Sequence, residues 1–314
     1  MPQLTCCPGL SQKTQAIINA SISAGTNSQY KTTFNRWIAY CSSKNIDPFK
    51  ATIAEGLEFL THLFEKFNLY YSAMNSARSA LSMIFPKSDG VTFGNAPIVS
   101  RYMKGVFKLR PSLPKYTTVY DADQVLQYLD LIQNESASLE RLGKKTLVLM
   151  LFMTSQRNQT MESIDLRTIH ECKPLKIIDI FIPEILKTTN PGRHLEPIRL
   201  NSYPRNINLC PVRTLNKYIE ITKDIRSEND NLFISYKAPH RQVVSTTLSK
   251  WAKSILSEAG IDISCFTAHS TRAASSSKKL AMNVSLADIR KAAGWTESST
   301  FAKYYKKPIV ASSL

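Results

Sequence analysis

The sequence predicts a mainly α-helical protein with one small β-hairpin or sheet, built as two domains over residues 1–112 and 113–314. Three observations predict this architecture. Apolar residues recur at helical spacing over most of the chain, whereas residues 177–200 have the composition of strands around a turn. The segment Arg110–Lys115 contains two prolines, each of which discourages helix at the residue before it, so we place the domain boundary there. The hydrophobic content of 43% is enough for a sizeable core in each part.

The first 112 residues predict a bundle of four helices. Tyr30, Phe34 and Trp37 share one helical face, and Trp37 is expected in the core. Thr52 and Glu55 form a capping box that starts the second helix, and Pro97 suits the first turn of the fourth. We therefore expect helices over residues 27–42, from 52 onward, over 72–85 and over 97–108.

The second part predicts helices and strands together. Ile177–Pro183 and Leu195–Leu200 are rich in apolar residues and flank a turn at Asn190–Gly192, which predicts a hairpin with a long loop. Trp251 is expected in the core of this part. Helices are expected on both sides of the hairpin, over residues 122–134, 138–154, 211–222 and 245–258, with three short helices from residue 268 to the end.

The chain is strongly basic, with 40 Lys+Arg against 24 Asp+Glu and a formal net charge of +16. Basic residues outnumber acidic ones on both sides of residue 112, so the excess is not confined to a basic tail. This balance points to a polyanionic partner, and nucleic acid is the first candidate.

Several functional classes are disfavoured because their sequence signals are missing. The longest apolar run, Leu147–Met153, is far shorter than the ~20 residues that a membrane span needs. The first residues lack the charged and apolar regions of a secretory signal. The six cysteines are too irregularly spaced for a disulfide framework or a zinc site, and no glycine-rich nucleotide-binding loop occurs. We expect no metal, no small-molecule cofactor and no membrane.

Five short motifs in the second part carry chemistry. In chain order they are Thr154–Thr160 with Arg157, Leu186–Gly192 with Lys187, His269-x-x-Arg272, Gly294–Trp295 and the pair Tyr304–Tyr305. Together they resemble the active-site half of the tyrosine recombinases, the phage integrase family. The resemblance extends over nearly the whole chain. It implies a helical, SAM-like core-binding domain in the first part and an α+β catalytic domain in the second.

The resemblance also implies a metal- and ATP-independent cut of DNA through a 3′-phosphotyrosyl intermediate. Arg157 and Arg272 would clamp the two non-bridging phosphate oxygens, because planar, permanently charged guanidinium groups match phosphate bidentately. His269 would assist as a hydrogen-bond donor or proton acceptor. Lys187 would protonate the leaving 5′ oxygen, and Trp295 would donate its indole N–H or pack against the nucleophile helix.

Either of two adjacent tyrosines fits the nucleophile. The spacing of the phage enzymes selects Tyr304, whereas an aromatic residue followed by Tyr-x-Lys-Pro selects Tyr305, which we favour. The second pattern, together with Arg78–Ser82 and the segment from Lys104 to Pro114, is similar to the recombinases of DIRS-type and Crypton-type eukaryotic mobile elements. Many family members carry a carboxylate at the position of Thr160, and the DIRS-like pattern tolerates this departure.

The same resemblance implies double-stranded DNA as the partner and a homotetramer on two DNA duplexes. The apolar segment after Pro308 would then dock onto a neighbouring protomer. We expect a nuclear protein if the source is eukaryotic, and a cytoplasmic one otherwise. Basic residues of the first part and the linker are predicted to contact DNA phosphates: Arg78, Arg101, Lys104, Lys108, Arg110 and Lys115.

These observations predict a site-specific DNA recombinase or integrase. The alternative is a catalytically inactive DNA-binding protein derived from such a recombinase. A type IB topoisomerase is a third possibility, which shares the chemistry without the pairing of two duplexes. Suitable residue types at every motif position favour the active recombinase.

Overall fold

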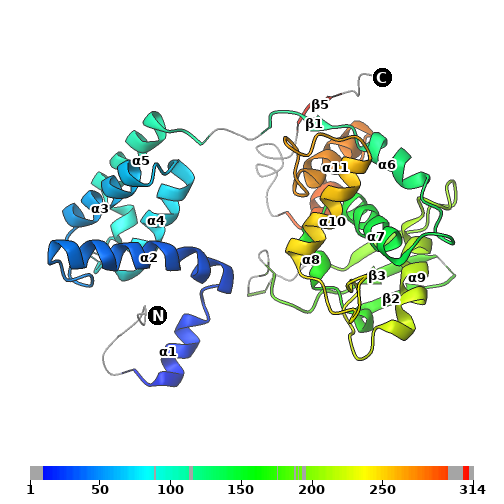
Figure 1. Cartoon of the computed structure of the whole chain (residues 1–314), viewed down its shortest axis with the longest axis horizontal. Helices are drawn as coiled ribbons and strands as arrows, with labels where there is room; N and C mark the ends of the chain where they lie inside the picture. The colour runs from blue at the N-terminus through cyan, green and yellow to red at the C-terminus, as the bar shows by residue number, and fades with distance from the viewer. Residues whose placement is uncertain are drawn as a thin grey trace. The chain divides into compact units, whose positions relative to one another are not determined.

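A computed structural model describes residues 10–87, 90–112, 116–174, 176–186, 189, 191–192, 196–295 and 307–310. The chain divides into two compact units, an N-terminal unit of residues 1–114 and a C-terminal unit of residues 115–314 (Figure 1). Each unit has its own hydrophobic core. Within the described residues, no helix is long and apolar enough to cross a membrane.

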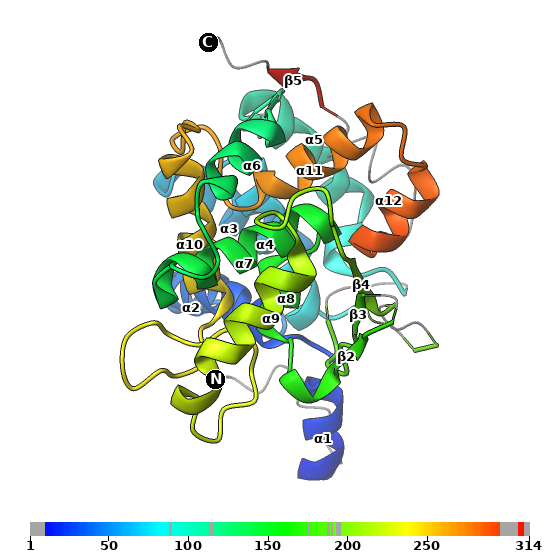
Figure 2. The ribbon, with the colours of Figure 1, turned by 90° about the vertical axis from the view of Figure 1, so that its right-hand side faces the viewer.

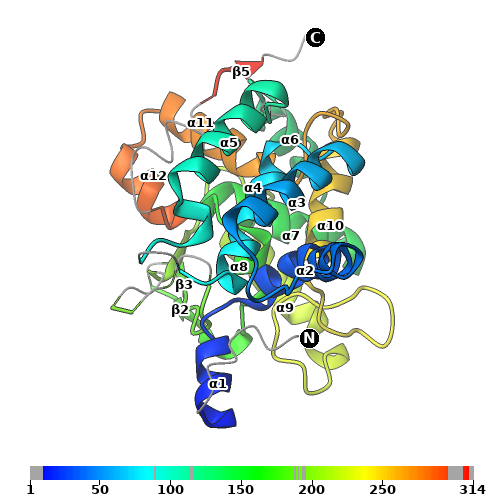
Figure 3. The ribbon, with the colours of Figure 1, turned by 90° about the vertical axis from the view of Figure 1, so that its left-hand side faces the viewer.

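The N-terminal unit is a helical bundle (Figure 3). Trp37, Phe59 and Met74 are fully buried in its core, as predicted for Trp37. The four predicted helices are confirmed, and a short, mostly polar first helix that buries no residue was not predicted. The elements are α1 (Gln12–Asn19), α2 (Ala24–Lys44), α3 (Ile53–Lys66), α4 (Tyr71–Ile84), the 3₁₀ turn η1 (Phe93–Asn95) and α5 (Pro97–Leu109).

Local sequence signals set the starts of these helices. Thr52 Oγ1 accepts the backbone N–H of Glu55 at 3.3 Å, and the Glu55 carboxylate accepts the backbone N–H of Thr52 at 2.7 Å. The predicted capping box is therefore present, and its hydrogen bonds lower the pKa of Glu55. Pro97 is the first residue of α5, where its missing N–H leaves no hydrogen bond unmade.

Gly56 on α3 packs against two phenylalanine rings of this core. A Cβ at this position would lie 2.5 Å from Phe93 Cε2 and 2.9 Å from Phe85 Cζ. We expect Gly56→Ala to lower the free energy of unfolding by about 1–3 kcal/mol, because the added methyl overpacks the core. Guanidinium unfolding of the full chain measures this. Gly105→Ala on α5 is the control, since its Cβ would meet nothing within 4 Å; equal losses in both variants would contradict the overpacking.

The C-terminal unit is built around one long, buried helix. Its helical elements are α6 (Ala122–Asp130), α7 (Leu139–Thr154), α8 (Asn158–Glu162), η2 (Leu166–Thr168), α9 (Pro211–Thr222), η3 (Lys223–Ile225), α10 (Ser245–Glu258), α11 (Ser270–Ala281) and α12 (Leu286–Ala293). Helix α7 lies at the centre and packs against α9, α10 and α11 (Figure 2). Trp251 on α10 is buried in this core, as predicted.

A small antiparallel sheet forms one part of this unit. Its strands are β2 (Ile169–Cys172), β3 (Ile177–Ile180) and β4 (Ile198–Asn201), in that order. The pairing of β3 with β4 confirms the predicted hairpin. Strand β2 was not predicted, because its side chains are mostly polar and exposed and carry no apolar alternation. A second pair, β1 (Val119–Tyr120) with β5 (Ile309–Val310), is parallel.

One predicted helix is shorter than expected, and another lies outside the described residues. The helix expected over residues 122–134 ends at Asp130, and just beyond its end Ile132 O accepts the Nζ of Lys145 at 2.5 Å. The last of the three short helices expected after residue 268 falls on residues that are not described, whereas α11 and α12 confirm the first two.

Lys145 is a buried cation in α7. Its side chain is fully buried, and burial lowers its pKa to about 8, against the opposing attraction of Asp130. The folded state therefore binds fewer protons than the unfolded state between about pH 8 and the ordinary lysine value of 10.5. Stability consequently rises with pH across that window.

We expect Lys145→Met to reduce this rise, because the variant has no amine to deprotonate. Between about pH 8 and about pH 9.5, the difference in the free energy of unfolding should amount to on the order of 1 kcal/mol. Urea denaturation at a series of pH values measures it. The exposed Lys250 on α10 gives the control Lys250→Met, which should keep the wild-type slope. An unchanged slope in Lys145→Met would contradict the prediction.

Candidate active site

Arg157 stands at the turn that joins α7 to α8. Helix α7 ends at Ser155, which adopts a left-handed backbone conformation with φ of 53°. This conformation reverses the chain and leaves Arg157 as the N-cap of α8, where its side chain is half-buried. The predicted first arginine is therefore held on a tight turn between two helices.

Arg272 lies on α11 and is 1% exposed. Its Nη2 donates to the carbonyl of Ala293, the last residue of α12, at 3.2 Å. Its guanidinium carbon lies 5.2 Å from the ring centroid of Trp295, which is also buried. Gly294 has φ of 65° and turns the chain at the end of α12, so that the Trp295 ring comes to Arg272. Two of the predicted motifs thus meet at this helix end.

The Arg157 turn reaches the same helix end. Gln156 is buried, and its Nε2 donates to the carbonyl of Ala292 at 2.7 Å. Two successive carbonyls at the C-terminus of α12 therefore accept hydrogen bonds from the neighbour of Arg157 and from Arg272. The structure brings together three motifs that are far apart in the sequence: the Arg157 turn, Arg272 and Trp295.

His269 is the N-cap of α11 and is exposed. Its carbonyl accepts the backbone N–H of Arg272 at 3.2 Å. The two residues were expected to share a helical face, but their environments differ, since His269 is open to solvent and Arg272 is buried. This difference suits a histidine that exchanges protons and an arginine that supplies fixed charge.

The side chains of Ser275 and Lys279, two polar residues of α11 that were not predicted, support the turn at Ser155. Ser155 Oγ lies 2.8 Å from Ser275 Oγ on α11. Lys279, also on α11, donates from Nζ to Met153 O at 2.6 Å and to Ser155 Oγ at 3.2 Å. Burial lowers the pKa of Lys279 to about 8. The sequence indicated these two residues only through their spacing: Ser275 and Lys279 follow Arg272 by three and seven residues, which places them near the same face of α11.

Lys187, Tyr304 and Tyr305 lie outside the described residues, but the chain is described again directly after the tyrosines. The backbone N–H of Lys307 donates to Ser277 Oγ on α11 at 3.3 Å. The Lys307 ammonium lies 4.5 Å from the ring centroid of Tyr116.

The next residues of this segment pair with their own chain. The N–H of Val119 donates to Pro308 O at 2.9 Å, and β5 continues alongside β1. Ile309 and Val310 therefore pair with β1 of their own chain, and docking of the segment after Pro308 onto a neighbouring protomer stays a prediction. Their backbone hydrogen bonds and the packing of Ile309 are satisfied within the chain.

The predicted phosphate-contacting residues of the N-terminal unit fall into two groups. Arg101, Lys104 and Lys108 are exposed and share one face of α5. Arg78 and Arg110 are half-buried and engaged within the unit: Arg78 Nη1 donates to Gly94 O at 3.2 Å, and the Arg110 guanidinium lies 3.6 Å from the ring centroid of Phe64. Lys115 is outside the described residues.

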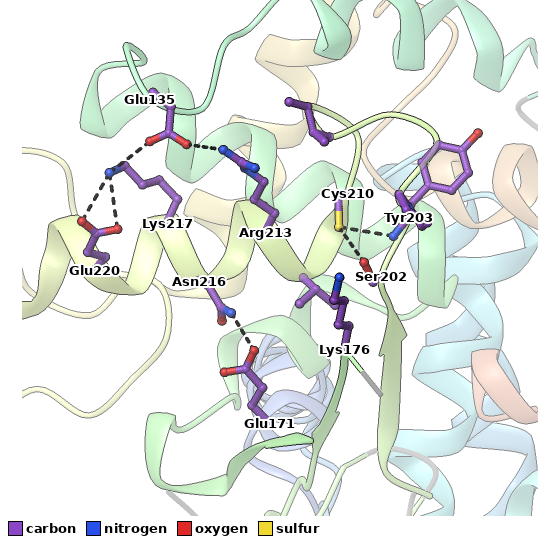
Figure 4. A pocket seen from close by; sticks show the side chains of 13 residues that line it. Glu135, Glu171, Lys176, Ser202, Tyr203, Cys210, Arg213, Asn216, Lys217 and Glu220 are labelled. Carbon is purple, nitrogen blue, oxygen red and sulfur yellow. Dashed lines mark hydrogen bonds and ion pairs between the residues drawn. The ribbon is translucent and has the colours of Figure 1, made fainter. Parts of the chain in front are cut away.

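A cleft of about 520 Å³ lies between the three-stranded sheet and α9 (Figure 4). Of the predicted catalytic residues that the structure describes, none lines it. Several of its charged side chains are paired with one another: Glu135 accepts from Arg213 at 3.0 Å and from Lys217 at 3.2 Å. The cleft is therefore separate from the candidate site. Among the described residues, no three His, Cys, Asp or Glu side chains come together as metal ligands.

Comparison with solved structures shows the same fold in three DNA-bound proteins. The Tn1549 transposon integrase in complex with transposon right end DNA is 11% identical, with a TM-score of 0.60, over 93% of this chain and 92% of that one. The XerH site-specific recombinase in a post-cleavage complex with a palindromic difH substrate is 15% identical, with a TM-score of 0.60, over 88% and 75%. A lambda integrase dimer bound to a COC′ core site is 15% identical, with a TM-score of 0.54, over 93% and 74%. These likenesses confirm the predicted fold class.

Comparison with curated protein sequences finds no match. The Phage integrase family matches residues 119–308, which is more than half of the chain and includes every predicted catalytic position. The chain therefore belongs to the phage integrase family, the tyrosine recombinases.

Proposed function

We propose that this protein is a site-specific DNA recombinase or integrase, which cuts and rejoins DNA strands through a 3′-phosphotyrosyl intermediate. The observation that carries the proposal is the convergence of the Arg157 turn, Arg272 and Trp295 at the C-terminal end of α12. Two arginines and an indole gathered in this way can surround one phosphodiester group.

The environments of the two arginines support a phosphate clamp. Arg272 is 1% exposed, and a permanent charge in such surroundings attracts a developing phosphorane charge more strongly than the same charge in water. Arg157 supplies the second planar fork from the half-buried N-cap of α8. Because the Arg272 side chain is held by Ala293 O and the Trp295 ring, little reorganisation of this arginine is needed when the transition state forms.

Tyr305 is the proposed nucleophile, with Tyr304 as the alternative. The phenol oxygen attacks phosphorus, and a tyrosyl P–O bond forms as the bond to the 5′ oxygen breaks. His269 takes the phenol proton and Lys187 protonates the leaving 5′ oxygen; religation reverses these transfers. The anchoring of Lys307 to α11 supports this assignment, since it ties the chain two residues after Tyr305 to the helix that carries Arg272.

Covalent trapping tests the function. Nicked duplexes drawn from the flanks of the protein's own gene should give an SDS-resistant protein–DNA band with the wild-type protein. Tyr305→Phe should abolish the band and Tyr304→Phe should keep it. Loss of the band in Tyr304→Phe alone would transfer the nucleophile to Tyr304. Arg272→Ala should slow formation of the band by a factor of about 10²–10³, as for removal of a donor to the transition-state charge.

Two outcomes would overturn this assignment. Near-normal cleavage by Arg272→Ala would remove Arg272 from the site. A gel shift without a covalent band, on these and on unrelated flanking sequences, would mean an inactive DNA-binding protein derived from a recombinase.

DNA affinity should depend steeply on salt, because the net charge of +16 implies many interactions with phosphate groups. We expect the affinity to fall by roughly 10²-fold or more between about 50 and about 200 mM salt. Replacing Arg101, Lys104 and Lys108 of α5 by alanine should weaken binding and reduce the salt slope by about one for each phosphate interaction removed. Fluorescence anisotropy with labelled duplexes measures both. Lys250→Ala, on the exposed side of α10, is the control; a slope that does not change in the triple variant would exclude α5 from the interface.

Double-stranded DNA is the proposed partner, and the proposed active form is a homotetramer on two duplexes. The similar XerH and lambda integrase structures contain a palindromic DNA site and a protein dimer on DNA, respectively, which supports assembly of several protomers on DNA. An affinity to DIRS-type and Crypton-type elements and a nuclear location belong to the same proposal, and both rest on the sequence patterns around Arg78, Lys104 and Tyr305.

A further inference from the structure

We propose that Gln156 is a positioning residue of the recombinase site, which holds the Arg157 turn and Arg272 in register through the C-terminal end of α12. This inference rests on the proposed function, because it assigns a role within that reaction. Gln156 does not contact the reacting atoms in the proposal. It acts through its neighbours.

Both polar atoms of the Gln156 carboxamide form hydrogen bonds. Its Nε2 donates to Ala292 O at 2.7 Å, and its Oε1 accepts from Thr160 Oγ1 at 3.3 Å. Gln156 and Thr160 are each 3% exposed, so water does not compete for these hydrogen bonds. A group that donates at one end and accepts at the other is needed here, and among side chains of this length only glutamine supplies it at every pH.

The acceptor of Gln156 explains why its position matters to Arg272. The last four carbonyls of a helix have no partner within the helix. At the end of α12, the carbonyls of Arg290 and Lys291 accept from the backbone N–H groups of Trp295 and Gly294. The carbonyls of Ala292 and Ala293 accept from side chains instead. Gln156 and Arg272 are the donors of those two hydrogen bonds. A shift of either side chain moves the helix end that orients the other.

The opposite end of the carboxamide fixes the direction of Arg157. Thr160 lies one turn into α8, and Arg157 is the N-cap of that helix. The hydrogen bond from Thr160 to Gln156 therefore ties the start of α8 to the same group that is bound to α12. We expect displacement of the Arg157 guanidinium by a fraction of an ångström to about 1 Å when this link is removed, a change that can cost about 10²-fold in rate.

The informative variant is Gln156→Glu, because its effect depends on protonation. A protonated carboxyl keeps a donor for Ala292 O and an acceptor for Thr160, whereas an ionised one has no donor. Burial raises the pKa of an introduced carboxyl into a range accessible to assay. We expect cleavage about 10- to 100-fold slower than wild type at about pH 8, and within about threefold of it at about pH 5.5.

The pH profiles are interpreted as a difference between variant and wild type. The charged side chains on the elements around Gln156 are present in both proteins, so the difference between the profiles reports the introduced carboxyl and its interaction with them: Arg157 and Glu162 beside and on α8, His269, Arg272, Lys278 and Lys279 beside and on α11, and Asp288, Arg290 and Lys291 on α12.

Two other variants complete the design. Gln159→Glu makes the same chemical change on the exposed side of α8 and should leave the rate and its pH profile as in wild type. Gln156→Leu removes both hydrogen bonds and should be slow at every pH. DNA affinity, measured separately by anisotropy, should stay within about twofold of wild type in all three variants, since the residue is buried away from solvent.

The outcomes separate this inference from the proposed function. Wild-type rates in both Gln156→Glu and Gln156→Leu would overturn the positioning role, and so would a pH-independent loss in Gln156→Glu. If the wild-type protein forms no covalent band, the proposed function fails. Hydrogen exchange then tests separately whether Gln156 holds the C-terminal end of α12. The backbone amides of Gly294 and Trp295 should exchange faster in Gln156→Leu than in wild type or Gln159→Glu, and equal exchange would overturn it.

Discussion

The C-terminal end of α12 is the constraint on which the candidate site depends. Every helix terminates with carbonyls that need external donors. Here a left-handed Gly294 lets the backbone satisfy two of them, and the side chains of Gln156 and Arg272 satisfy two more. A general requirement of helix termination thus becomes the means by which three separate stretches of sequence are brought to one place. The Trp295 ring follows directly from the Gly294 turn and closes this arrangement over Arg272.

Helix α11 provides the second constraint, because Trp295 and Lys307 both contact it. Trp295 packs against Arg272, and five residues further along the same helix Ser277 accepts the N–H of Lys307. The pairing of β5 with β1 reinforces the second attachment, yet it involves only two residues on each strand.

The elements that could be predicted from the sequence are those set by local pattern. The helix over residues 245–258 matches α10 because its apolar face is continuous, and the capping box at Thr52 marks the start of α3. The end of α6 at Asp130 could not be predicted, since the residues that follow it include Ile132 and Leu131, which continue the apolar helical pattern of the sequence. Strand β2 could not be predicted either, since it is defined by its antiparallel pairing with β3 and not by an apolar pattern of its own.

The same distinction applies to the site. Arg157 and Arg272 were recognisable from their motifs, because their chemistry requires those residue types in that order. Gln156 and Lys279 were not, since their roles depend on hydrogen bonds between residues more than a hundred positions apart. The apolar pattern after Pro308 indicates that this segment packs against a partner strand, but it carries no information about which copy of β1 that is; here β5 pairs with β1 of its own chain.

The distribution of positive charge separates DNA affinity from DNA cleavage. Arg101, Lys104 and Lys108 are exposed, so in the proposed complex their attraction to phosphate would be screened by salt and would add binding energy without precise geometry. Arg272 is buried, and its attraction is weakly screened but depends on the position of a single helix end. Salt should therefore weaken binding far more than it slows the chemical step on DNA that is already bound. In the proposed reaction the +16 charge attracts the duplex, and the buried arginine acts only once a phosphodiester has been brought to it.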